Sequence, residues 1–196
     1  HHKNVSTPAD PSSARKNEAL QLFWLRSVFG AYKSAWHLEN ARLRRKKQPV
    51  FGLQNEMLIF TMVQLAMLLT VFLLFGAAVL LWFFLAAVFG FLLLETVNYI
   101  EHYGLARHKV SEFRYENAQP QHSWNSDHVL GRLLLFELSR HSDHHFKASK
   151  KYQLLEHHDA SPQMPTGYPG MMILAFLPPL WFWVMNGRVA QWTKTS

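Results

Sequence analysis

The stretch from Met57 to Leu94 contains no charged residue, and this feature constrains the fold of the chain most strongly. A membrane span needs about 20 apolar residues, whereas one continuous helix over this stretch would be about 57 Å long. A single span cannot use that length, so we predict two transmembrane helices over 57–94, with a reversal near Gly76. The alternative, a buried core helix of a soluble protein, would not stay uncharged for so long.

Basic residues lie outside the apolar stretch and give the chain a formal net charge of +7. Between Asn17 and Lys47, apolar residues recur at helical spacing and basic residues occupy the opposite side, which predicts a basic amphipathic helix. Such a helix lies in a membrane interface or packs on protein, and this segment alone favours neither. The positive-inside rule places its basic end in the cytoplasm, and a two-span hairpin returns the chain to the same side.

The chain contains no cysteine, which excludes disulfides, haem-thiolate sites and iron–sulfur clusters. Its 196 residues are enough for one domain. Positive charge suits either nucleic acid or an anionic membrane face. Because the basic residues flank predicted membrane spans and no recognisable nucleic-acid module is present, we expect a lipid bilayer and no nucleic acid as partner.

Three histidines in the spacing H-x-x-H-H are the main candidates for function: His141, His144 and His145. On a helix, positions i, i+3 and i+4 share one face, so the imidazoles would project toward one point while Asp143 points away. Imidazole binds zinc, copper, iron or nickel, and three imidazoles are unfavourable to bury without a metal. The triplet therefore predicts a metal site; the alternative is three unrelated histidines. Apolar residues over 129–138 predict a helical segment leading into it.

A second histidine element directly follows the apolar stretch. Glu95, Asn98 and His102 lie at i, i+3 and i+7 and share a helical face. His102 is a candidate metal ligand, which places the histidine site at the cytoplasmic end of the spans. Other polar residues are expected to contact ligand histidines or set the local charge without replacing histidine at the metal. These candidates are Glu95, Asn98, Glu101, Asp143 and Glu137, the last one helical turn before His141.

Two motifs carry a resemblance to a known family. N-Y-I-E-H-Y-G at 98–104 and R-H-S-D-H-H at 140–145 are similar to the signature boxes of the membrane-bound alkane 1-monooxygenases, which are integral-membrane diiron alkane ω-hydroxylases. H-S-W-N-S at 122–126 and P-T-G-Y at 165–168 also resemble segments of this family and occur in the same order. The initial His1-His2, followed by V-S-T-P-A-D-P, resembles the end of the family's second histidine box, E-H-x-x-x-H-H. On this resemblance we expect a C-terminal fragment that lacks the first box and the upstream membrane helices, and that is inactive alone.

The resemblance implies a function: terminal hydroxylation of medium- and long-chain n-alkanes to 1-alkanols with O2 and electrons from rubredoxin and its rubredoxin reductase. It also implies a multi-pass protein of the bacterial inner membrane with its active site on the cytoplasmic side. The six candidate metal ligands are His1, His2, His102, His141, His144 and His145. Six exceed the roughly four ligands of one structural zinc, so two metal ions are expected. Spacing alone does not choose among iron, copper and nickel; the resemblance implies two Fe ions. No residue is assigned as a general acid or base.

These observations predict an all-α fold, an integral-membrane helical bundle with a cytoplasmic histidine-rich metal site. One domain over 1–196 is expected, with a loop and the basic helix over 1–56, two spans over 57–94 and the histidine region over 95–196. Within that region, the apolar segment 171–185 is short and contains Pro178-Pro179, so it is expected to dip into the membrane or lie at its interface. The histidines expected outside the metal shell are His37, His108, His122, His128, His157 and His158.

Two other readings remain alternatives. A membrane fatty-acid desaturase or hydroxylase also uses histidine boxes, although the combination of N-Y-x-E-H-Y-G with R-H-S-D-H-H argues against it. A non-enzymatic membrane haem electron-transfer protein would need paired histidines within facing spans, and 57–94 contains none. Ser139 stands where a glutamine is commoner in the family and leaves the ligand spacing intact. The chain-length preference for the alkane stays open.

Overall fold

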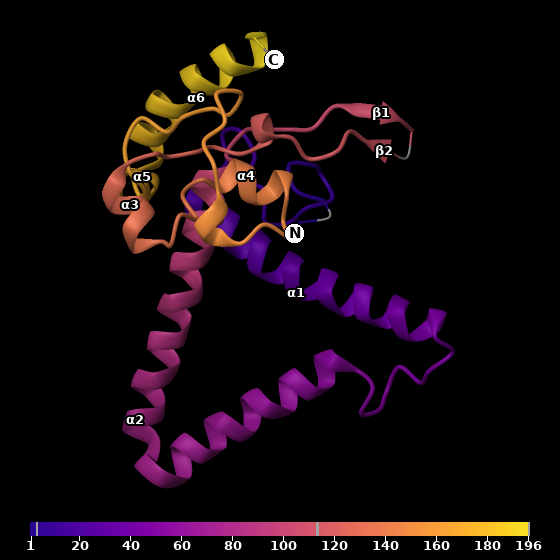
Figure 1. Ribbon diagram of the computed structural model, residues 1–196. Coiled ribbons are helices and arrows are strands. Elements are labelled where there is room, and N and C mark those ends of the chain that lie inside the picture. Colours follow the sequence, from indigo (N-terminus) through magenta and orange to yellow (C-terminus); the bar gives the residue numbers. More distant parts are fainter. Residues whose placement is uncertain (3, 113, 196) are drawn as a thin grey trace. The chain divides into compact units, whose positions relative to one another are not determined.

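The computed structural model describes residues 1–2, 4–112 and 114–195, and it is mostly helical (Figure 1). Two compact units make up the chain: residues 1–28 together with 94–196, and residues 29–93. The helices in the described ranges are α1 (Leu20–Arg45), α2 (Glu56–His102), α3 (Val129–Leu134), α4 (His141–Phe146), α5 (Tyr168–Ala175) and α6 (Pro178–Thr195). Shorter elements are the strands β1 (Lys109–Ser111) and β2 (Arg114–Tyr115) and the 3-10 turns η1 (Pro120–His122) and η2 (Tyr152–Leu154).

The unit over residues 29–93 contains the end of α1 and most of α2. Gly76 interrupts α2 with backbone angles (φ 79°, ψ 177°) that are accessible to glycine and strained for other residues, and α2 bends sharply there (Figure 1). The predicted position of the break is therefore confirmed. Within the described residues, α2 alone is long and apolar enough to cross a membrane, and its most apolar window is not buried. The assignment of two membrane spans to it stays a prediction.

Polar contacts within this unit fix the start of α2. The Asn55 side-chain oxygen accepts a hydrogen bond from the Leu58 N–H at 3.2 Å, which is the geometry of a helix N-cap. Glu39 of α1 accepts the Glu56 N–H at 2.8 Å and forms an ion pair with Arg42 at 2.6 Å. These contacts join the end of α1 to the start of α2.

A core of buried aromatic side chains holds the other unit together. Tyr99 and Tyr103, near the end of α2, pack against Trp181 of α6 with ring centroids 5.1 and 5.2 Å apart. Phe23 of α1 packs edge-to-face on Tyr99 at 5.4 Å. All four side chains are fully buried. The last turn of α2, which ends at His102, is therefore held by α1 and α6 together.

The apolar segment near the C-terminus forms α5 and α6, which are separated at residues 176–177. Proline has no N–H to donate and is tolerated only in the first turn of a helix, so Pro178-Pro179 start α6 and the predicted interruption is confirmed. Met171 and Trp181 point into the core, whereas Ile173 and Trp183 are exposed. The position of this segment relative to a membrane stays a prediction.

Two local elements differ from expectation. Strands β1 and β2 form an antiparallel hairpin, with Lys109 opposite Tyr115, so the fold is not purely α. The predicted helical segment over 129–138 is confirmed only for Val129–Leu134, because α3 ends there and Phe136 and Glu137 adopt left-handed φ angles of 51° and 63°. Such angles cannot continue a right-handed helix. A break therefore separates α3 from α4.

Replacing Trp181 by alanine is expected to destabilise the protein by about 3–5 kcal/mol, because a large side chain is removed from a closed core. Trp183→Ala, two residues further along α6, is the matched control: its side chain is 81% exposed, and a change within about 0.5 kcal/mol is expected. Thermal unfolding of the detergent-solubilised protein measures both. Equal effects of the two substitutions would contradict the buried position of Trp181.

Candidate metal centre

Helix α4 carries the histidine triplet on one short helical segment, as predicted. His141 and His145 are buried, and His144 is half-buried. The His141 and His145 ring centroids lie 4.4 Å apart, and the His144 ring lies 5.7 and 5.5 Å from them. The helical spacing therefore brings the three imidazoles side by side.

His102, the last residue of α2, also lies beside these imidazoles. Its Nε2 atom lies 3.2 Å from Nε2 of His141. The chain leaves the helix at Gly104, which has a left-handed φ of 70° and donates its N–H to the Ala14 carbonyl at 3.0 Å. A Cβ at this position would come within 3.0 Å of a Val189 methyl group, so both backbone angle and space require glycine. This explains the glycine that closes the N-Y-I-E-H-Y-G motif.

His1 completes a cluster of four. Its Nε2 atom lies 3.3 Å from Nε2 of His145, and one ring nitrogen from each of His1, His102, His141 and His145 lies within 4.8 Å of all the others. Two nitrogens bound to one ion at about 2.1 Å lie about 3.0–3.4 Å apart. The close pairs His102–His141 and His1–His145 both have this spacing. The donor set thus fits a metal ion that prefers imidazole.

His2 and His144, the other two predicted ligands, lie beside the cluster of four. Their ring centroids are 4.8 Å apart, and the His2 ring is 4.7 Å from that of His145. All six candidate histidines are therefore brought together in one place. Their division between two metal ions stays a prediction.

The electrostatics of the cluster favour neutral imidazoles. Burial lowers the pKa values of His141 and His145, and the neighbouring histidines lower them further because adjacent positive charges repel. Burial also lowers the pKa values of His2 and His144. A metal binds only the unprotonated nitrogen, so these shifts keep the ligand atoms available at neutral pH.

Two carboxylates contact the cluster. One oxygen of Asp10 accepts hydrogen bonds from Nδ1 of His1 at 2.8 Å and from the Ser13 hydroxyl at 2.6 Å, and its other oxygen accepts the Ser12 N–H at 3.1 Å. Glu101 has one oxygen 3.1 Å from Nε2 of His141, while its other oxygen accepts the Tyr168 hydroxyl at 2.7 Å. Burial, followed by the charge of Glu101, raises the pKa of Tyr168, so this hydroxyl stays a donor. The predicted contact of Glu101 with a candidate ligand is thus present.

Within the described residues, neither Glu95 nor Asn98 makes the predicted contact with a clustered histidine. Glu95 accepts a hydrogen bond from the Ser27 hydroxyl of α1, and the hydroxyls of Ser27 and Ser12 are 3.2 Å apart. Asn98 is half-buried and makes no hydrogen bond to a histidine in the described part of the chain. Glu95 and Asn98 share a helical face with His102, but at 1.5 Å rise per residue they lie about 10 and 6 Å from it along the helix axis.

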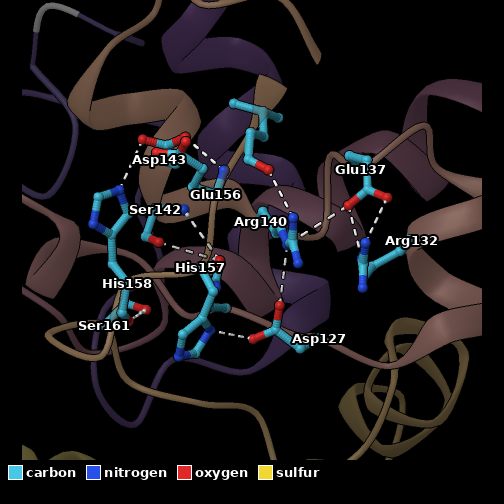
Figure 2. Close-up of polar contacts among 12 residues, drawn as sticks. Asp127, Arg132, Glu137, Arg140, Ser142, Asp143, Glu156, His157, His158 and Ser161 are labelled. Atoms are coloured by element: carbon cyan, nitrogen blue, oxygen red, sulfur yellow. Dashed lines mark hydrogen bonds and ion pairs between the residues drawn. The ribbon is translucent and has the colours of Figure 1, made fainter. Parts of the chain in front are cut away.

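Figure 2 shows that Glu137 and Asp143 bind groups other than the ligand imidazoles. Glu137 pairs with Arg132 at 2.8 Å and with Arg140 at 3.6 Å, so the predicted orientation of His141 by Glu137 was wrong. The break at residues 136–137 removes the helical register on which it relied. Asp143 points away from the imidazoles, as predicted: its oxygens accept from Lys150 at 2.8 Å and His158 at 2.8 Å.

The remaining histidines lie outside the cluster of four. His122 contacts Glu116 at 3.2 Å, and its Nδ1 accepts the Gln119 N–H. His157 pairs with Asp127 at 2.5 Å (Figure 2). His37 is exposed in the other unit, and His108 and His128 are exposed without a contact to the four clustered rings in the described residues. No metal ligand is assigned among these histidines.

Three residues that contact the clustered histidines or their neighbours were not identified from the sequence: Asp10, Tyr168 and Asn125. Asp10 lies in the V-S-T-P-A-D-P run and Tyr168 in P-T-G-Y, so both fall within segments that the motifs had marked. Their partners, His1 and Glu101, are nine and 67 residues away. Contacts of this kind leave no periodic signal in the sequence.

The fold and the histidine cluster define a helical, metal-binding class of protein, and the chain belongs to the fatty acid desaturase family, which it matches over residues 1–175. It is 47% identical over 189 residues to alkane 1-monooxygenase 1 of Pseudomonas aeruginosa, which covers 96% of this chain and 50% of that protein. It is 43% identical over 195 residues to the alkane 1-monooxygenase of Ectopseudomonas oleovorans (98% and 48%). It is 29% identical over 185 residues to the xylene/toluene monooxygenase hydroxylase component of Pseudomonas putida (93% and 48%). The chain therefore spans about half the length of these curated relatives.

The Asp10 contact predicts a role in metal affinity. Asp10→Ala is expected to weaken binding of a divalent metal about tenfold to a hundredfold, because His1 loses the acceptor that orients its ring. Asp159→Ala is the control, since the Asp159 side chain is fully exposed and its ion pair within the described residues is with His157, outside the cluster. Titration with cobalt(II), followed by its visible absorption, measures both affinities. An Asp10→Ala affinity equal to that of Asp159→Ala would contradict the role.

Burial of His122 predicts a pH dependence of stability. Burial lowers the pKa of His122 below that of the unfolded chain despite the nearby Glu116 carboxylate, so between these two pKa values the unfolded state binds more protons. Stability is then complete above about pH 6.5 and falls as the pH drops below it. His122→Gln is expected to reduce the difference between the thermal midpoints at pH 7.5 and 5.5, whereas His37→Gln is expected to leave it unchanged. A difference between the two thermal midpoints in His122→Gln equal to that of the parent would contradict the prediction.

Proposed function

We propose that this chain forms the metal-binding part of a membrane-bound alkane monooxygenase, which hydroxylates n-alkanes at the terminal carbon with O2 to give 1-alkanols. The observation that carries this proposal is the cluster of four imidazoles built from His1, the end of α2 and α4. It occurs in a chain that is 40–47% identical to proteins named alkane 1-monooxygenase. The identity supports the substrate class, and the cluster supports the type of chemistry.

The donor set supports two iron ions held by the six clustered histidines. Imidazole suits iron, copper, nickel and zinc, and the chain has no thiolate that would favour a different site. Of the six, His1, His102, His141 and His145 would supply the closest nitrogens, with His2 and His144 beside them. Iron bound there would supply the activation of O2 that an unactivated C–H bond requires.

The protein's own contribution is to hold these nitrogens neutral and in place. Burial keeps the imidazoles of α4 unprotonated. Asp10 fixes the ring of His1 through Nδ1, which leaves Nε2 directed toward His145. The Tyr168 hydroxyl holds one oxygen of Glu101 and leaves the other beside His141. An alkane has neither an acidic proton nor a carbonyl group, so no residue is given the role of general acid or base.

A substrate that partitions into lipid suits the apolar character of α2. Its side chains are largely exposed over the uncharged stretch, and hydrocarbon is the solvent that stabilises such a surface. Arg42, Arg44 and Arg45 end α1 shortly before α2 begins. By the positive-inside rule, this supports a multi-pass protein of the bacterial inner membrane with its metal centre on the cytoplasmic side.

The proposed electron donor is rubredoxin, reduced by rubredoxin reductase. Hydroxylation inserts one oxygen atom of O2 into the C–H bond and releases the other as water, which requires two electrons and two protons beyond those that the alkane supplies. The histidines provide no electrons, so an external reductant is required. The net charge of +7 supports steering of a small acidic electron-transfer protein to this chain. Medium- and long-chain alkanes are the proposed substrates.

Desaturation of a fatty acyl chain is the second candidate, and the name of the matched family favours it. Both reactions attack an unactivated C–H bond beside a histidine-rich metal centre. They differ in product: an alkane monooxygenase inserts oxygen, whereas a desaturase removes two hydrogens and leaves a double bond. Product analysis therefore separates them.

The test is to express the protein from its full-length gene, purify it in detergent, and measure metal content and products with rubredoxin and its reductase. Two irons per chain and 1-octanol from octane are expected. His141→Ala should lower the rate more than roughly a hundredfold, since a lost ligand harms the site more than a lost ligand partner. His37→Ala, which changes a histidine outside the cluster, should leave the rate unchanged. One zinc per chain, or an alkene product from acyl chains, would overturn the proposal.

A further inference from the structure

The segment His122–Ser126, which the sequence singled out as H-S-W-N-S, contacts every element that carries a clustered histidine. Its first residue accepts the Ser6 hydroxyl through its carbonyl at 2.7 Å, which ties it to the loop after His1 and His2. The Trp124 N–H donates to the Glu101 carbonyl at 2.8 Å, beside His102. The Ser126 N–H donates to the Ser139 carbonyl at 2.9 Å, just before α4.

Of the elements that carry a clustered histidine, helix α4 has the fewest stabilising contacts of its own. It has six residues, and so short a helix is marginal without tertiary contacts. Arg140 occupies its N-cap position and makes no side-chain capping bond. The side-chain guanidinium of Arg140 instead donates to Asp127 at 3.2 Å and to the Leu155 carbonyl at 2.7 Å (Figure 2). The first-turn N–H groups of α4 therefore need an acceptor from elsewhere.

Asn125 supplies that acceptor from 17 residues away. Its Oδ1 atom accepts both the backbone N–H of Ser142 at 3.4 Å and the Ser142 hydroxyl at 3.2 Å. Ser142 is the second residue of α4, whose N–H a local N-cap side chain would normally bind. Asn125 is fully buried, and its Nδ2 atom has no protein partner in the described residues. The side chain thus acts here solely as an acceptor for the start of α4.

We propose that Asn125 is a positioning residue of the metal centre: it caps α4 from a distance and so sets the three α4 histidines against His102, His1 and His2. The same segment holds the end of α2 through Trp124 and places the Ser123 hydroxyl 3.4 Å from Nδ1 of His102. One short segment therefore fixes both sides of the His102–His141 pair. The inference rests on the metal site of the proposed function and assigns a role that the ligand motifs do not contain.

The experiment measures metal binding, so its outcome does not depend on activity. The purified full-length protein, freed of metal, is titrated with cobalt(II), and the visible absorption gives affinity and stoichiometry. Asn125→Leu keeps the side-chain size and removes the acceptor; a loss of affinity of about tenfold to a hundredfold is expected. Asn125→Asp keeps an acceptor, and aspartate caps helices as well as asparagine does, so an affinity within about fivefold of the parent is expected.

Asn55→Leu is the matched control for a merely structural effect. Asn55 is also buried and also caps a helix, but at the start of α2 in the unit without clustered histidines. Asn55→Leu is expected to lower the thermal midpoint and to leave cobalt affinity within about twofold of the parent, since the cap it removes stabilises the start of α2 and not an element that carries a clustered histidine. Equal losses of affinity in Asn55→Leu and Asn125→Leu would overturn the proposal.

A double-mutant cycle isolates the contact itself. Ser142→Ala removes one of the two bonds to Asn125 and leaves the N–H bond, so it is expected to weaken cobalt binding less than Asn125→Leu does. In the Asn125→Leu background, Ser142→Ala should have no further effect, because its partner is already gone. Additive losses, or an Asn125→Leu affinity within about twofold of the parent, would overturn the inference.

If Asn125→Leu does not accumulate in membranes, Ser142→Ala and Asn125→Asp decide the matter. Weaker cobalt binding by Ser142→Ala, together with near-parental binding by Asn125→Asp, supports the cap. Cobalt binding by Ser142→Ala equal to that of the parent overturns it. If the parent protein itself binds no cobalt, the metal site of the proposed function fails. That result is distinct from a parent that binds metal while Asn125→Leu binds it equally well, which defeats this inference alone.

Discussion

Four imidazole nitrogens within 4.8 Å of one another are the constraint on which the rest of the structure depends. Burial disfavours the positively charged, doubly protonated form of each ring, and a positive charge on one ring opposes a charge on the next. Neutral nitrogens that face each other gain little from their own contact, so other parts of the chain must hold them there. The first loop, the end of α2 and α4 each carry part of the cluster, and the segment His122–Ser126 bonds to all three.

Carboxylates around the cluster divide into two groups by their partners. Asp10 and Glu101 face imidazoles, at 2.8 Å from His1 and 3.1 Å from His141. Glu137 instead pairs with Arg132, and Asp143 with His158 (Figure 2). Asp143 also pairs with Lys150. The charges of these two carboxylates are balanced by their partners, although the Asp143 side chain itself is buried. The inward carboxylates are those whose position orients a ring or adds negative charge beside a metal.

The apolar helix α2 agrees with the hydrocarbon substrate of the proposed function. A hydrocarbon substrate offers no hydrogen-bonding group, so recognition depends on excluding water and on apolar contact. α2 presents apolar side chains along the uncharged stretch and ends at His102, so one continuous element leads from that surface to a candidate ligand. The break at Gly76 allows two shorter apolar segments within it. This arrangement, together with identity to alkane 1-monooxygenases, supports the proposed hydroxylation of a lipid-soluble alkane.

The sequence by itself determined the features that depend on near neighbours along the chain. The helical spacing of His141, His144 and His145, the break at Gly76 and the interruption at Pro178-Pro179 all follow from local periodicity or backbone freedom. Tertiary structure alone decided which polar groups meet. In a continuous helix, Glu137 would lie on the same face as His141, but the left-handed turn at 136–137 breaks the helix between them. Asp10 reaches His1 across a turn, and Asn125 reaches Ser142 across 17 residues. A hydrogen bond between distant segments is set by how the whole core packs, and no spacing in the sequence encodes it.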